Sequence, residues 1–175
     1  MFNDVNGMPL HPLIIHAPVI GIPLAFLLTL LFAFPRTRAW ARWPLALTVL
    51  GSTAAVWASR ESGEVLRATK KLFPGNLAGD LIQRHAQLAT QLFFIMIGFS
   101  VITLLAVFLV GRRQTATVDE SGTTSRPGGG RRVLNLILLG LLLLVAVVAF
   151  VWTARVGDIG ARAVWNPTSN GLFPF

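Results

Sequence analysis

Three histidines are the side chains of this 175-residue chain best suited to hold a cofactor. His11 and His16 lie near the start of the sequence, each followed closely by proline, and His85 stands alone near its middle. Neutral imidazole is a common protein ligand of haem iron. Five residues turn a helix by about 140°, so His11 and His16 cannot both ligate one metal from a regular helix. We therefore expect one of them to pair with His85, with His16 as the first choice because it lies deeper in an apolar segment, and His11 as the second.

The cofactor that this pair would suit is a non-covalently bound b-type haem. His85 lies in an apolar stripe with Leu81 and Leu88, and a porphyrin requires apolar walls. No Cys-x-x-Cys-His motif is present for covalent attachment. The alternative is that the histidines bind no cofactor and donate hydrogen bonds to a backbone carbonyl or to an acid such as Glu64. Both interpretations remain open on the sequence alone.

A second set of candidates is polar and charged. Arg60 and Glu64 are one helical turn apart and can form an ion pair. Together with Arg84, Arg155 and Asp158 they could form a proton or substrate site. The alternative is a set of solvated helix ends with ordinary ion pairs.

Composition excludes several classes of protein. Charged residues make up 13% of the chain, about half the roughly 25% of soluble domains. The chain has no cysteine, which excludes disulfides, thiolate metal sites and thiol catalysis. We find no HExxH, nucleophile-elbow or P-loop motif and expect no independent enzymatic activity. The net charge of +8 comes mostly from arginines that flank apolar runs, so we expect a lipid bilayer as partner and no nucleic acid.

The elements that must position these residues are four apolar segments long enough to cross a bilayer. They cover about residues 12–34, 39–59, 86–110 and 133–154, with a flexible linker over about 111–132. Helical spacing continues past the second segment until Phe73-Pro74-Gly75, and the third helix should begin early, near Asn76. The predicted fold is an all-α, polytopic four-helix membrane bundle in a single domain.

The two halves of the chain carry a similar pattern. Val56-Trp57-x-x-Arg60 recurs 95 residues later as Val151-Trp152-x-x-Arg155, and Arg-Ala follows both. Either a helical hairpin was duplicated, or the two pairs reflect the aromatic composition of membrane interfaces.

Four crossings place all three histidines and most of the acidic residues at the end of the bundle that carries both termini. The opposite end is rich in arginine, which favours a cytoplasmic position for it. We therefore expect a bacterial inner-membrane protein with both termini outside.

Three segments resemble a known family of small membrane proteins. Leu10-His11-Pro12-Leu13-Ile14-Ile15-His16-Ala17-Pro18 is similar to the opening motif of the domain of unknown function 2231, and Arg84-His85-Ala86 and Gly157-x-x-Gly160-x-x-x-Val164-Trp165 resemble its later segments. The resemblance implies a four-helix membrane domain. Some relatives carry a Rieske iron–sulfur domain, which implies a redox setting and, for this cysteine-free chain, a separate partner. The family's motif often continues with a basic residue, histidine and glycine, where this chain has Asn166-Pro167.

Three functions follow from these observations. The first is a non-enzymatic accessory or scaffold subunit, with a redox or other membrane-protein partner or as a homo-oligomer. The second is a b-type haem electron-transfer subunit that uses His85 with His16 or His11. The third is a small transporter or proton relay that uses Arg60, Glu64 and His85.

Overall fold

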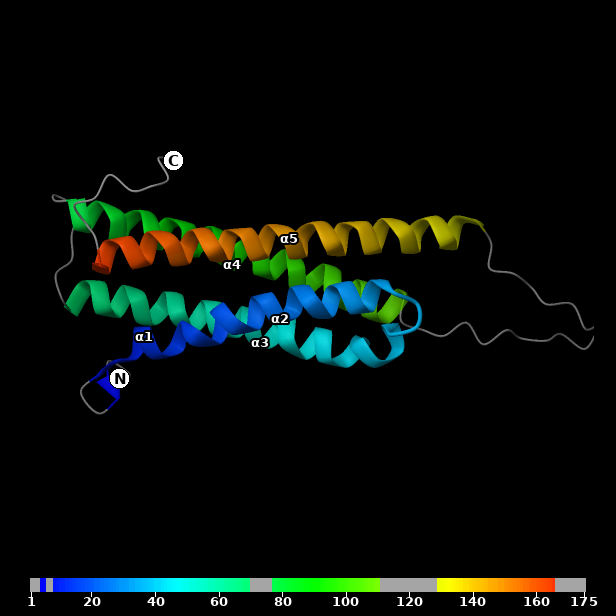
Figure 1. Ribbon diagram of the computed structural model, residues 1–175, viewed down its shortest axis with the longest axis horizontal. Helices are drawn as coiled ribbons and strands as arrows, with labels where there is room; N and C mark the ends of the chain where they lie inside the picture. Colours follow the sequence, from blue (N-terminus) through cyan, green and yellow to red (C-terminus); the bar gives the residue numbers. More distant parts are fainter. Residues whose placement is uncertain (1–3, 6–7, 70–76, 111–128, 166–175) are drawn as a thin grey trace, which may run out of the picture.

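The computed structural model is an elongated helical bundle whose long helices run side by side (Figure 1). It describes residues 4–5, 8–69, 77–110 and 129–165. The strands β1 (Asp4–Val5) and β2 (Met8–Pro9) form a short antiparallel ladder before the first helix. The helices follow as α1 (Leu10–Ile14), α2 (His16–Ala33), α3 (Arg38–Thr69), α4 (Leu77–Leu109) and α5 (Gly129–Trp165).

Prolines set the boundaries of the first hairpin. The ring of Pro18 conflicts with the carbonyl of Ile14 in a regular helix, and Ile15 forms the turn that separates α1 from α2. Phe34 is extended (φ −78°, ψ 129°) because it precedes Pro35, and this conformation ends α2. The Arg38 guanidinium then donates to the carbonyls of Phe32 (3.1 Å) and Ala33 (2.8 Å), which caps the end of α2.

The four long helices form a ring in which each packs against two neighbours. α3 lies between α2 and α4, and α5 lies between α4 and α2. The core between them is apolar, and its largest fully buried side chains include Ile22, Phe32, Leu45, Met96, Phe99 and Leu142. Other large apolar side chains, such as Ile20, Leu47, Phe94 and Leu144, are exposed on the outside, where lipid would cover them. The predicted all-α membrane bundle is confirmed.

Three helical stretches in the described part of the chain are long and apolar enough to cross a membrane: Leu10–Ala33, Ala78–Leu109 and Arg132–Trp165. α3 is not among them, although a span was predicted at 39–59. Its apolar run is interrupted by serines, and Ser52, Ser59 and Ser62 are buried among its apolar core residues. Thr53 on α3 also hydrogen bonds Ser100 on α4 at 2.8 Å. α3 nevertheless runs the length of the bundle, so its place is that of a fourth crossing (Figure 1).

The helices extend beyond the predicted apolar segments. α3 continues to Thr69 and α4 begins at Leu77, as the helical spacing indicated, and the expected turn lies outside the described residues. α5 begins at Gly129, so the end of the predicted linker is helical, and residues 111–128 lie outside the described part. α5 also continues past 154 to Trp165, and Asp158 and Arg162 form an ion pair one turn apart in this extension, with Nη2 and Oδ2 2.9 Å apart.

Candidate functional site

The candidate site lies at one end of the bundle, where α1 and α4 begin and α3 and α5 end (Figure 1). All three histidines belong to this end, as the topology predicted. The histidines that approach each other are His11 and His85, whose ring centres lie 6.2 Å apart with their planes nearly perpendicular, at 86°.

His11 is fixed by the end of α3. Its Nδ1 donates to the backbone carbonyl of Ser59 at 2.8 Å and lies 3.3 Å from the hydroxyl of Ser62. The Ser62 hydroxyl donates to the same Ser59 carbonyl at 2.9 Å. His11 lies inside α1, and its ring is held by the neighbouring helix α3.

His85 is fixed in the same way by the end of α5. Its Nδ1 donates to the backbone carbonyl of Val156 at 2.9 Å. An acid such as Glu64 had been considered as its partner, but Glu64 is exposed and the bond goes to the carbonyl instead. α5 runs beside α4 along the bundle, so its backbone is closer to His85 than a side chain on α3.

The two backbone bonds determine which ring nitrogens are free. A carbonyl oxygen can only accept, so each Nδ1 must carry the hydrogen. In a neutral imidazole the other nitrogen, Nε2, then keeps its lone pair. Within the described part of the chain neither Nε2 has a hydrogen-bond partner. Two half-buried imidazoles, with ring centres 6.2 Å apart, therefore offer two unused nitrogen ligands.

A glycine lies against each histidine. A Cβ on Gly63 would lie 3.1 Å from Cε1 of His11, and a Cβ on Gly160 would lie 2.9 Å from Cε1 and Nδ1 of His85. The second distance is shorter than real Cβ contacts, so a side chain at Gly160 would displace the ring. Gly157, by contrast, has no atom within 4 Å of such a Cβ. The close approach of α5 to His85 therefore requires glycine at position 160 and not at position 157.

The structure does not bring His16 to the pair. His16 begins α2 and is exposed, while His11 points toward α3 from the preceding turn. The sequence favours His16 as the partner of His85 because His16 lies deeper in the apolar segment than His11. Rotation about the helix axis decides instead. Ile15 keeps helical dihedral angles (φ −59°, ψ −22°), so the two residues stay about 140° apart around the axis.

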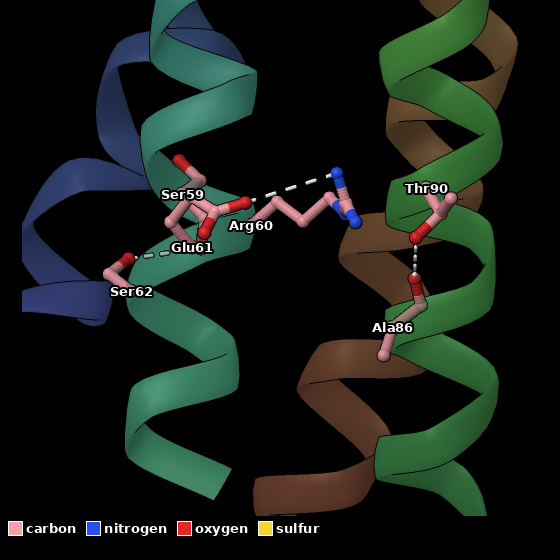
Figure 2. A network of polar contacts seen from close by, with 6 residues as sticks. All are labelled: Ser59, Arg60, Glu61, Ser62, Ala86 and Thr90. Carbon is pink, nitrogen blue, oxygen red and sulfur yellow. Dashed lines mark hydrogen bonds and ion pairs between the residues drawn. The ribbon is translucent and has the colours of Figure 1, made fainter.

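The polar candidates at this end do not form one cluster. Figure 2 shows Arg60 reaching from α3 toward α4. Its ion pair is with Glu61, at 3.9 Å, and not with Glu64 as the spacing suggested. Arg84 and Arg155 are exposed, and Asp158 pairs with Arg162. In this part of the molecule the residues proposed for a proton relay are therefore dispersed.

The residues that the sequence prediction missed are the acceptors Ser59 and Val156 and the glycine Gly63. Gly160 was noted only as part of the family-like segment Gly157-x-x-Gly160. In each half the glycine follows the acceptor by four residues, one helical turn. A recognisable signal accompanied them: Glu61-x-Gly63 is repeated as Asp158-x-Gly160, 97 residues later. The structurally equivalent residues of the two halves are therefore 97 residues apart, whereas the Trp-x-x-Arg sequences are 95 residues apart.

Two histidines are too few for an ordinary protein metal centre. Among the residues that the structure describes, no group of three or more His, Cys, Asp or Glu side chains could hold a metal ion. Zinc sites use three or four protein ligands, whereas haem iron takes four from the porphyrin and needs one or two from the protein. The donor set therefore fits haem better than a free ion.

Comparisons with known proteins agree with the fold. No curated protein and no solved structure gives a significant match. A family model described as predicted membrane protein (DUF2231) matches residues 7–168, which includes both histidines of the pair and both of their backbone acceptors. The match covers nearly the whole chain, and the chain therefore belongs to the DUF2231 family of predicted membrane proteins.

Proposed function

We propose that this membrane protein binds one b-type haem between His11 and His85 and serves as an electron-transfer subunit. When bound, such a haem supplies a one-electron couple between ferric and ferrous iron. The donor and acceptor of that electron would be a membrane redox partner. The observation that carries the proposal is the pair of imidazoles with both Nδ1 atoms donating to backbone carbonyls.

This hydrogen bonding is the arrangement that prepares histidine for metal binding. A ligating histidine usually donates its other ring N–H to a carbonyl or carboxylate, which fixes the tautomer and the orientation of the ring. Two such imidazoles cannot hydrogen-bond each other through Nε2, because neither Nε2 has a hydrogen to donate. Charging both would place two cations 6.2 Å apart in a half-buried site, which is costly.

The separation of the rings also supports the proposal. An imidazole nitrogen binds a metal at about 2 Å and lies about 1.1 Å from its ring centre, so two rings on opposite sides of one metal have centres about 6 Å apart. The observed distance is 6.2 Å. Edge-to-face packing of two rings without a ligand also reaches this separation, so the absorption spectrum is the necessary test.

The test is a spectrum of the detergent-solubilised protein, as purified and after reconstitution with haem. We expect a Soret band and the reduced spectrum of a low-spin, six-coordinate haem. His11→Ala and His85→Ala should each lose the six-coordinate spectrum, while the matched variant His16→Ala should keep it because His16 is exposed and outside the pair.

Absence of a Soret band from the reconstituted wild-type protein would refute the proposal. The two histidines would then serve to join α1 to α3 and α4 to α5, as in an accessory scaffold. A band that survives His11→Ala but is lost in His16→Ala would restore His16 as the ligand.

A further inference from the structure

Arg60 is the charged residue closest along the chain to the acceptor of His11. It follows Ser59 on α3, and its side chain extends toward α4, where the guanidinium carbon lies 5.8 Å from the centre of the Phe93 ring (Figure 2). A helical side chain leans toward the N-terminus of its helix, so Arg60 leans from the end of α3 back toward the middle of the bundle. Its charge is thereby held beside apolar groups.

The partners of Arg60 in the described structure do not satisfy it. Nη1 lies 3.9 Å from Glu61, a long contact to a carboxylate that is 55% exposed. Nε is buried and has no hydrogen-bond partner among the described residues. Arg38 shows the contrast, since its guanidinium donates to two carbonyls at 3.1 and 2.8 Å. A charged side chain at membrane depth calls for a counter-charge.

We infer that Arg60 binds a propionate carboxylate of the haem, an inference that rests on the function proposed above. A b-type haem carries two propionates at its edge, and the guanidinium is the side chain best matched to a carboxylate because it presents paired N–H donors. Arg60 carries an unused N–H donor next to the residue that holds His11. The inference makes Arg60 a binding residue for the periphery of the haem, distinct from the ligands of the iron.

Arg155 provides a matched comparison. It occupies the corresponding place in the second Trp-x-x-Arg sequence and precedes Val156, the acceptor of His85. Unlike Arg60 it is exposed, and its guanidinium lies over its own helix, 5.1 Å from the Trp152 ring centre. Its position favours solvent or lipid headgroups over the centre of the bundle.

The experiment compares haem with haem dimethyl ester, in which both propionates are blocked. Each is titrated into apoprotein of the wild type, Arg60→Gln and Arg155→Gln, with circular dichroism to compare their helix content. We expect Arg60→Gln to weaken haem binding at least about tenfold, the size of one lost charged hydrogen bond, and to change dimethyl ester binding less than about twofold. Arg155→Gln should leave both affinities within about twofold.

The outcomes separate this inference from the proposed function. If the wild-type protein binds neither compound, the haem proposal fails and the inference fails with it. If the wild type binds both compounds and Arg60→Gln weakens both equally, or neither, Arg60 holds no propionate while the haem proposal stands. An equal loss of haem alone in Arg155→Gln would also overturn the assignment to Arg60.

Discussion

Replacing Gly160 by alanine tests the close approach of α5 to His85. The added Cβ would lie 2.9 Å from Cε1 and Nδ1 of the ring, whereas 3.4 Å is the beginning of ordinary contact. The ring must therefore retreat by about half an ångström, which stretches its 2.9 Å bond to Val156 beyond the usual range.

The expected free-energy change combines opposing effects. Alanine gains about 0.5–1 kcal/mol over glycine inside a helix. Overpacking costs about 1–3 kcal/mol, and the strained hydrogen bond adds about 1 kcal/mol. Gly160→Ala should therefore destabilise the protein by about 1–3.5 kcal/mol. The control is Gly157→Ala, on the same helix and just under one turn before Gly160. No atom lies within 4 Å of a Cβ at that position, so Gly157→Ala should leave the stability unchanged or raise it.

The assay is thermal unfolding of the apoproteins in detergent, followed by haem titration of the same samples. About 1–3.5 kcal/mol corresponds to a fall in Tm of several degrees or more for a chain of this size. The Tm of Gly63→Ala should lie between those of the other two variants, because its added Cβ would approach the His11 ring only to 3.1 Å. If Gly160→Ala and Gly157→Ala have the same Tm and the same haem affinity, the packing argument is refuted.

Three further substitutions test the contacts that hold the bundle together. Thr53→Val removes the 2.8 Å hydrogen bond between Thr53 on α3 and Ser100 on α4. The control is Thr90→Val, because the Thr90 hydroxyl bonds within its own helix. Thr53→Val should lower the free energy of unfolding, measured in urea or by heating, by about 0.5–1.5 kcal/mol more than Thr90→Val does. Arg38→Gln loses two charge-assisted bonds to the end of α2 and should cost about 1–2 kcal/mol, while exposed Arg36→Gln should change unfolding little. Asp158→Asn breaks an ion pair whose carboxylate is about half exposed and should change Tm by no more than about a degree; a larger fall would show that the pair supports the end of α5.

The fold was predictable to the extent that apolar runs determine it. The segments at 12–34, 86–110 and 133–154 coincide with helices because a bilayer-spanning length of apolar residues has no other stable form. Helix ends were harder, because the prediction ended each span at its first charged residue. Arg155 interrupts the apolar run without interrupting backbone hydrogen bonding, so α5 continues for ten more residues, to Trp165.

The candidate site was predictable in residue type and in place along the bundle, but not in its contacts. All three histidines were expected at one end, and His11 with His85 was the second choice. The choice between His11 and His16 depends on which side of the helix faces α3 and α4, which apolar spacing does not specify. The acceptors are backbone carbonyls, which every residue has, so no residue type marks Ser59 or Val156 in the sequence. The remaining indication in the sequence is the pair of glycines, Gly63 and Gly160, each four residues after an acceptor.

Each histidine is oriented by the other long helix of its own hairpin, His11 by α3 and His85 by α5, and this has a consequence for biogenesis. The chain leaves the ribosome from its N-terminus, so the first hairpin can orient His11 before α4 and α5 are inserted into the membrane. The second hairpin can orient His85 independently. A ligand that needs both imidazoles can then be captured only after α5 has entered the bilayer, so cofactor loading would be the final step of assembly and would report that all helices are in place.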